Sequence, residues 1–431
     1  MEQINFIFKT SLVVKLFSVL SILIIVPAVH TSLSDERFAL WTILTGLTAV
    51  SQFSDLGIGN SLINIVSELN AENNHEEIRK AITNASVILF LLGILMLIVY
   101  ISFYFLVDWA KLLNFKYLEI INEAKLSFSM VILLFVINLP FNTVQRVQIG
   151  MQRGHIANIW NIAGLILSLF GVIICSHIKA TLLPFVLATI GGPLVATIMS
   201  WSYEYYVLNP KLRPKATDLN FHSWPKIISQ SRLWALVQLV AFLAIGLDAM
   251  IISYYFTPIS VTQYSILLRL YSGLLIAPLY SAPSWPAFND AIKNKDIKEA
   301  TKILKTVTLI GLILGIIGAL IVYFCGQMLI DFWLIKTIIL DSKFVVAFSI
   351  WLIVSSLYAC LSSPMSAQKT LPSLLIYSTS AAFIATLIKI CLLPNAGPEF
   401  VVLANSIGYG LMCVFAYYKL SSFIKYESTL N

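Results

Sequence analysis

The sequence has 431 residues, of which 58% are hydrophobic and 11% are charged, and its mean hydropathy is +0.87. Soluble proteins carry about 25% charged residues, so this composition excludes a sizeable soluble domain and predicts an all-α integral membrane protein. The net charge of +7 comes from basic residues scattered over many short segments, a distribution that argues against nucleic acid as a partner.

Apolar runs of helix length follow one another along the whole chain. A membrane-spanning helix needs roughly 20 mainly apolar residues, and the runs predict about twelve such helices. We place them at about 9–30, 38–66, 81–107, 126–150, 156–177, 181–207, 229–253, 261–288, 304–325, 343–366, 371–392 and 398–419. The first run is too long for a signal peptide and is expected to remain as a span.

Lysine and arginine are distributed unevenly between the two sets of connecting segments. The set that includes both termini carries 18 of the 28 basic residues. Because positive residues accumulate on the cytoplasmic side, both termini are predicted to be cytoplasmic. Lys15 and Arg269 lie inside spans, and the other set of segments holds Arg37, Lys111, Lys116, Lys125, Lys179, Lys336, Lys343 and Lys389.

The chain contains landmarks that recur after 222, 223 and 216 residues. They are Glu77-Ile-Arg-Lys80 with Glu299-Ala-Thr-Lys302, Asp108-Trp109 with Asp331-Phe332, and Met151-Gln-Arg153 with Ala367-Gln-Lys369. Near-constant offsets predict two six-helix lobes, 1–207 and 227–431, related by a pseudo-twofold axis along the membrane normal. The Pro-rich and basic segment 208–226 is predicted to be a cytoplasmic linker.

The second helix of each predicted lobe carries helix-breaking residues. Span 2 contains Gly57 and Gly59, and span 8 contains Pro278, Pro283 and Pro286. Interrupted helices at corresponding positions of two repeats indicate a transport site. Glycine also allows close helix packing, so both interpretations stay open.

Five charged residues lie within the apolar runs, where each costs on the order of 2.5–3.5 kcal/mol at a helix centre. They are Lys15, Asp55, Arg146, Asp248 and Arg269. Such residues normally face a water-filled cavity or an opposite charge, so Arg269, Lys15 and Arg146 are candidates for binding substrate. Asp55 and Asp248 are candidates for ion coupling or for a counter-charge. Lys15 and Arg146 can also reach the interface by snorkelling, and Asp248 fits an ordinary helix end.

Span 4 adds a polar stripe. Asn138, Asn142 and Arg146 recur every four residues, with Gln145 beside them, so they lie along one helix face. Because lipid cannot satisfy polar groups, the stripe is predicted to face a lumen, where Asn142 and Gln145 would contact substrate. A hydrogen-bonded seam between helices explains the same pattern equally well.

Several patterns are missing from the sequence. It has no Gly-x-x-x-x-Gly-Lys phosphate loop, no His/Cys/carboxylate cluster with metal-ligand spacing, and no Asp-x-Asp pair typical of a metal-assisted glycosyltransferase. We therefore expect no cofactor and no metal, and a transporter rather than an enzyme.

Phe38-Ala-Leu-Trp41, followed by Ser54-Asp-Leu-Gly-Ile-Gly-Asn-Ser-Leu62, resembles the start of Wzx-type O-antigen flippases. These belong to the polysaccharide transporter branch of the MATE-like (MOP) exporter superfamily. The resemblance implies two lobes around a cationic cavity in a bacterial inner membrane. It also implies ion-coupled transfer of undecaprenyl-diphosphate-linked oligosaccharide from the cytoplasmic to the periplasmic leaflet, with other polysaccharide assembly proteins as partners.

Two other functions stay open. A MATE-like antiporter of small organic molecules would be expected to have an acidic cavity, whereas the charges within the spans are three basic and two acidic. A membrane polysaccharide polymerase would be expected to have a large periplasmic loop, and the sequence leaves no room for one.

Overall fold

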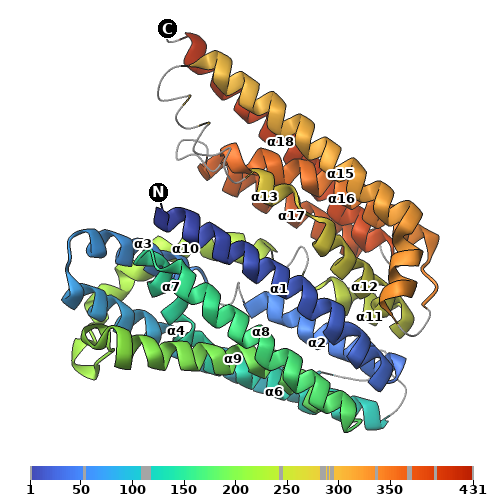
Figure 1. Ribbon diagram of the computed structural model, residues 1–431, viewed down its shortest axis with the longest axis horizontal. Helices are drawn as coiled ribbons and strands as arrows, with labels where there is room; N and C mark the ends of the chain where they lie inside the picture. The colour runs from blue at the N-terminus through green and yellow to red at the C-terminus, as the bar shows by residue number, and fades with distance from the viewer. Residues whose placement is uncertain are drawn as a thin grey trace. The chain divides into compact units, whose positions relative to one another are not determined.

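A computed structural model describes residues 2–51, 55–107, 118–241, 246–281, 288, 291, 296–334, 338–365, 371–392 and 396–429. The regular elements within these ranges are all helices. Internal contacts divide the chain into two compact units, Met1–Leu239 and Val240–Asn431. Figure 1 shows the helices of each unit, coloured in chain order.

The first unit consists of long helices followed by a more polar segment. Its α-helices are α1 (Glu2–Ser32), α2 (Asp35–Ser51), α3 (Ile58–Ala71), α4 (His75–Leu106), α6 (Leu118–Phe141), α7 (Thr143–Gly150), α8 (Gly154–His177), α9 (Leu182–Tyr203) and most of α10 (Trp224–Ala241). A π-helix (Glu204–Leu208) and 3-10 turns (Pro210–Leu212, Ala216–Asp218, Phe221–Ser223) separate α9 from α10. α8 packs against α1 and α9, and α4 packs against α6.

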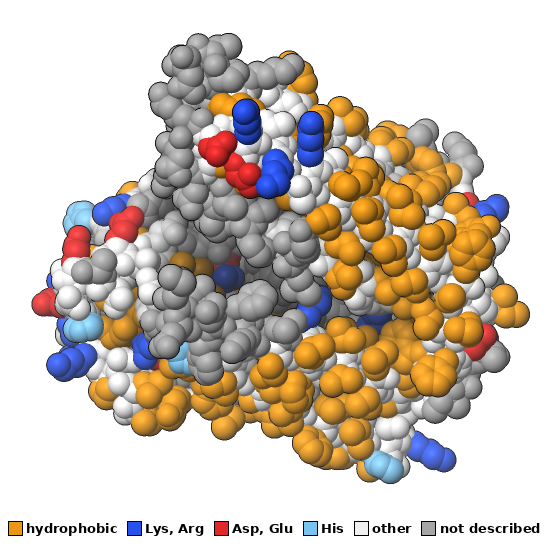
Figure 2. Space-filling model, turned by 45° about the horizontal axis from the view of Figure 1, so that its top comes forward, with side chains coloured by type: hydrophobic (Ala, Val, Ile, Leu, Met, Phe, Trp, Pro, Cys, Tyr) orange, Lys and Arg blue, Asp and Glu red, His pale blue; other side chains and the backbone are white. Residues whose placement is uncertain are grey.

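The exposed apolar surface of these helices indicates that they lie in a membrane. Only 17% of the most apolar stretch of α4 is buried, and Phe105 and Leu106 are 78% and 84% exposed. Hydrophobic side chains also cover much of the face seen in Figure 2. Soluble proteins rarely expose apolar patches of this extent. Eight spans in the described ranges are long and apolar enough to cross a membrane, so the protein is a multi-pass membrane protein.

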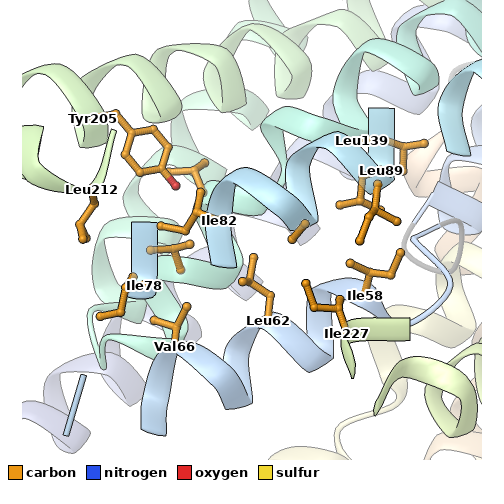
Figure 3. Packing of buried hydrophobic residues seen from close by; sticks show 14 residues of the cluster. Ile58, Leu62, Val66, Ile78, Ile82, Leu89, Leu139, Tyr205, Leu212 and Ile227 are labelled. Carbon is orange, nitrogen blue, oxygen red and sulfur yellow. The ribbon is translucent and has the colours of Figure 1, made fainter. Parts of the chain in front are cut away.

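A buried apolar cluster fixes α3, α4 and α7 to one another (Figure 3). Leu62 and Val66 of α3 face Ile78 and Ile82 of α4. The valines of α7, Val144 and Val147, belong to the same cluster. A Cβ atom on Gly150 would lie 2.9 Å from the backbone of Ile63 and from the Val66 side chain, so only glycine permits this approach of α7 to α3. The cluster thereby holds α7, which carries Arg146, in a fixed place.

The segment after the π-helix folds against α4. Arg79 of α4 donates two hydrogen bonds to the Asp218 carboxylate, at 2.6 and 3.2 Å, and buried Asn84 donates to the Asp218 carbonyl. The Arg79 hydrogen bonds lower the pKa of Asp218 below its ordinary value, so the ion pair persists at neutral pH. Much of the segment expected to be a linker is thus tied to the first unit.

The second unit begins within α10. Its further helices are α11 (Asp248–Tyr255), α12 (Pro258–Leu274), α13 (Ala277–Ser281), α15 (Ile297–Trp333), α16 (Ser342–Met365), α17 (Leu371–Leu392) and α18 (Phe400–Thr429). α16 packs against both α15 and α18, which also contact each other, and α17 packs against α18 (Figure 1). The pairs α15–α16 and α17–α18 match the pairs α4–α6 and α8–α9 of the first unit in order and packing.

The helices α4 and α15, which begin at the first pair of repeated landmarks, start with the same cap. Asn74 accepts a hydrogen bond from the Glu77 amide at 3.2 Å, and Asp296 accepts one from the Glu299 amide at 2.9 Å. An N-cap of this kind satisfies an amide that the helix leaves unpaired. The landmarks Asp108-Trp109 and Ala367-Gln-Lys369 lie outside the described residues, and the count of twelve spans stays a prediction.

Candidate functional site

A turn that begins at Asp55 leads into α3. Leu56 and Gly57 both have positive φ angles, 47° and 76°, and the Ile58 amide donates to the Asp55 carbonyl at 3.0 Å. Two successive left-handed residues with this bond form a tight reverse turn, which favours glycine at its second central position. The turn separates α2 from α3 and orients the Asp55 side chain.

The Asp55 carboxylate is buried and accepts hydrogen bonds from two uncharged donors. The Gly57 amide lies 2.9 Å from Oδ1, and Nε2 of Gln238 on α10 lies 3.0 Å from the same oxygen. Hydrogen bonds to a carboxylate are stronger than those between neutral groups. The turn and α10 therefore hold the Asp55 side chain in place independently of its cation.

Arg146 of α7 supplies the cation. One guanidinium nitrogen lies 3.4 Å from Asp55 Oδ2, and another lies 3.5 Å from the Asn60 side-chain oxygen. Both distances are long for charge-assisted hydrogen bonds, which are usually about 2.7–2.9 Å. The Arg146 side chain is 22% exposed, whereas the Asp55 side chain is 6% exposed. The carboxylate is thus enclosed, and its cation is loosely held and partly accessible.

Gly59 is the residue that allows this approach. A Cβ atom at this position would collide with the Asp55 carboxylate and the Arg146 guanidinium. The two glycines of the motif therefore have different tasks, because Gly57 permits the turn and Gly59 leaves room for the ion pair.

Span 4 has a one-residue irregularity just before the turn that carries Arg146. α6 ends at Phe141, immediately after Pro140, and α7 begins at Thr143. Proline cannot donate the backbone hydrogen bond of a regular helix, which explains this local irregularity, and residues 119–150 still form one apolar span. Asn142 is half-buried at the junction, where its amide still donates to the Asn138 carbonyl at 2.8 Å.

The rest of the expected polar stripe points to several neighbours. Gln145 donates to Asn161 of α8 at 3.1 Å, which is a contact between helices. Asn138 lines a cavity of about 110 Å³ with Thr189 and Pro193 of α9. Lys15 is exposed on α1, and the described residues contain no ion-pair partner for it.

A second buried charge pair lies in the second unit. The Asp248 carboxylate accepts from Lys389 Nζ at 2.5 Å, from Asn405 Nδ2 at 2.7 Å and from the Tyr264 hydroxyl at 3.0 Å. Both charged side chains are 0% exposed. Together the four residues join α11, α12, α17 and α18. Unlike Asp55, Asp248 is therefore surrounded by short contacts and sealed from solvent.

The placement of Lys389 in a connecting segment is wrong. It lies inside α17 and is fully buried. Sequence reasoning also missed Gln238, Tyr264 and Asn405, which carry no distinguishing pattern. One signal was present for Lys389, because it is the only basic residue of 371–392 and a carboxylate within an apolar segment requires a cation.

Arg269 is half-buried on α12. It follows Tyr264 by five residues, or about 140° around the helix, and so it lies off the face that reaches Asp248. Pro278 is exposed in the short helix α13, after α12 has ended at Leu274. Pro283 and Pro286 lie outside the described residues.

The family profile described as polysaccharide biosynthesis protein matches residues 8–289. The chain belongs to this family. A Salmonella typhi protein named "Putative O-antigen transporter" is 24% identical over 262 residues, which cover 59% of this chain and 57% of that protein. A Salmonella typhimurium protein of the same name is 22% identical over 296 residues, covering 65% and 64%. The alignments thus span less than two thirds of each relative.

Solved structures establish the fold of this polysaccharide biosynthesis family member. An inward-facing multidrug resistance MATE family transporter of the MOP superfamily matches it with a TM-score of 0.76 at 12% identity, over 96% of each chain. The lipid II flippase MurJ, in an inward closed conformation, matches with a TM-score of 0.69 at 14% identity, over 96% of this chain and 87% of MurJ. The expected all-α, MATE-like membrane fold is confirmed.

Proposed function

We propose that the protein is a flippase that moves undecaprenyl-diphosphate-linked oligosaccharide across a bacterial inner membrane by alternating access, driven by an ion gradient. The family, the two relatives named as O-antigen transporters and the fold shared with MurJ support this class of cargo. The same neighbours are transporters, which favours transport over catalysis.

The proposal rests on a difference within the Asp55–Arg146 pair. Asp55 is held by hydrogen bonds from Gly57 and Gln238, whereas Arg146 is loosely held and partly exposed. If Arg146 turns toward a diphosphate, Asp55 keeps its hydrogen bonds from Gly57 and Gln238. When Arg146 departs, the buried Asp55 carboxylate therefore still has hydrogen-bond donors. Loss of all partners by a buried charge is what usually makes breaking a buried ion pair costly. Guanidinium also matches phosphate oxygens with a planar set of donors.

The proposed cycle uses Asp55 as the counter-charge of the empty transporter. Arg146 binds the cargo phosphate in one state and returns to Asp55 when the cargo leaves. A proton or other cation on Asp55 would favour the state in which Arg146 is released. Asn142 and Gln145, close to Arg146 in the sequence, and Lys15 remain candidate contacts for the sugars and phosphates.

We expect Arg146→Ala to reduce export of surface polysaccharide roughly ten- to hundredfold, because one hydrogen bond to a charged group contributes about 1.5–3 kcal/mol. Arg146→Lys should retain part of the activity, since the charge remains and the planar set of donors is lost. The measurement is complementation of a flippase-deficient strain, with polysaccharide scored at equal protein abundance.

Two further variants separate binding from structure. Arg37 forms ion pairs with Glu119 and Glu123 and is 27% exposed, so Arg37→Ala tests the loss of a comparable pair, and we expect it to retain export. Asp55→Asn should not rescue Arg146→Ala if Arg146 holds the cargo. Recovered export in the double variant, or loss of Arg146→Ala from the membrane, would show that the pair is only structural.

The excess of basic residues in one set of connecting segments supports a topology with both termini in the cytoplasm. A cytoplasmic reporter fused after Tyr426 should therefore be active, and a periplasmic reporter at the same position should be silent. The reverse pattern would overturn the orientation.

The match to a multidrug resistance transporter favours a second candidate, an antiporter of small organic molecules. That function predicts raised drug resistance on expression, with no change in surface polysaccharide. The partly exposed cation at Arg146 suits an anionic cargo better than a cationic drug.

A further inference from the structure

The segment between α9 and α10, residues 204–226, begins where a membrane span ends. The apolar run of α9 continues through the π-helix to Leu208. Aromatic rings gather at this end, because the ring centres of Trp201 and Tyr206 lie 6.1 Å apart, as do those of Tyr203 and Trp160 of α8. Tryptophan and tyrosine concentrate where a span meets the lipid head groups. These rings therefore mark the membrane interface.

α4 holds the same segment at the depth where its own apolar run begins. The Lys215 amide donates to the Thr83 hydroxyl at 3.3 Å, and the Asn84 side chain donates to the Asp218 carbonyl at 3.1 Å. The uninterrupted apolar run of α4 starts at Val87, about one turn later. Two membrane helices thus place the segment beside the head groups rather than in bulk solvent.

The two carboxylates of segment 204–226 are buried and already neutralised. Glu204 accepts a hydrogen bond from Arg153 at 2.6 Å, and Asp218 accepts one from Arg79 at 2.6 Å. Glu204 is 0% exposed and Asp218 is 8% exposed. Neither arginine belongs to the segment, so the negative charges of the segment are compensated from outside and do not offset its own cations.

The lysines and the arginine of the segment are all exposed. They are Lys211, Arg213, Lys215 and Lys226. Within the described part of the chain, none of them forms an ion pair with a carboxylate. The Arg213 guanidinium lies 4.4 Å from the centre of the Tyr206 ring, and this cation–π contact fixes one of the cations to the aromatic rings of the interface. The segment therefore presents uncompensated positive charge at head-group depth.

We propose that segment 204–226 binds the phosphate groups of anionic phospholipids, with Lys211 and Lys215 as the contacts and the Arg213–Tyr206 stack holding the segment at the interface. An anionic lipid supplies the charge that the segment lacks, at the depth where its cations lie. A soluble acidic protein would have to displace the head groups to reach the same cations. The interaction adds a lipid partner to the protein and leaves the cargo contact of Arg146 unchanged.

The test uses the full-length protein in nanodiscs of neutral phosphatidylcholine. The probe is a phosphatidylglycerol that carries a photoactivatable group near its head group. Labelling should be saturable, should map to residues 204–226, and should be displaced by unlabelled phosphatidylglycerol but not by inorganic phosphate, which separates a lipid head group from a free anion. Lys211→Gln with Lys215→Gln should weaken labelling roughly twenty-five-fold, or about fivefold for each cation near an anionic surface.

Lys298→Gln with Lys305→Gln is the matched control, because both lysines are exposed on α15 and the same charge is lost. In this variant the segment should be labelled as in the wild type. Equal labelling by the corresponding phosphatidylcholine probe, displacement by inorganic phosphate, or wild-type labelling after loss of Lys211 and Lys215 would refute the head-group site. Because no cargo is present, each of these results leaves the flippase proposal standing.

Discussion

Replacing Lys389 with alanine should destabilise the second unit by about 3–5 kcal/mol, the usual cost of leaving a buried charge without its partner. The reason is geometric, because Asp248 and Lys389 are both 0% exposed and water cannot replace the ammonium. For a unit of this size the loss corresponds to a fall of about 10 °C in melting temperature. Thermal unfolding of the purified protein, followed by intrinsic fluorescence, measures it.

The double variant Asp248→Asn with Lys389→Met separates the effect of the charge pair on stability from that of the neighbouring hydrogen bonds. It removes both charges, and the asparagine oxygen can still accept from Tyr264 and Asn405, so we expect stability closer to the wild type than in Lys389→Ala. Lys343→Ala controls for the loss of a lysine at an exposed position of α16. A melting temperature of Lys389→Ala equal to that of the wild type would show that the pair is not a structural tie between helices.

Arg269→Ala should abolish export of surface polysaccharide while the protein remains at normal abundance. Arg269 follows the start of α12 by eleven residues, or about 16 Å of helix, too far for easy snorkelling from that end. Its guanidinium is suited to a phosphate of the cargo, because its planar set of donors matches phosphate oxygens. Arg269→Lys should retain partial export because the positive charge remains.

The control for this variant is Arg213→Ala. Arg213 is exposed and its guanidinium lies 4.4 Å from the centre of the Tyr206 ring, outside the spans, so its loss should leave export unchanged. Normal export by Arg269→Ala, or disappearance of the protein from the membrane, would remove Arg269 from cargo recognition.

The sequence was sufficient to predict the fold class, because apolar runs of membrane length dominate the composition and because each membrane helix carries its signal locally. The interruption at Gly57 could also be predicted, because glycine is a local signal that disfavours a helix. Pro140 was equally visible, but the irregularity after it was not predicted, since membrane helices accommodate proline in several ways.

The partners of the buried charges could not be predicted in this way. Asp55 meets Gln238 and Arg146, and Asp248 meets Lys389, each across more than 90 residues of chain. Such pairings depend on helix rotation and depth, and uncertainty of a few residues at a span boundary changes both. The predicted span 371–392 has the bounds of α17, so the boundary did not hide this pair; the rotation that turns Lys389 toward Asp248 cannot be read from the sequence.

The Asp248–Lys389 pair also imposes an order of events on synthesis of the protein. The two residues are 141 positions apart, so at roughly 5–20 residues per second Lys389 is made on the order of ten seconds after Asp248. During that interval a lone carboxylate at membrane depth costs about 2.5–3.5 kcal/mol. Asp248 of α11 therefore gains its buried cation only after α17 has been made.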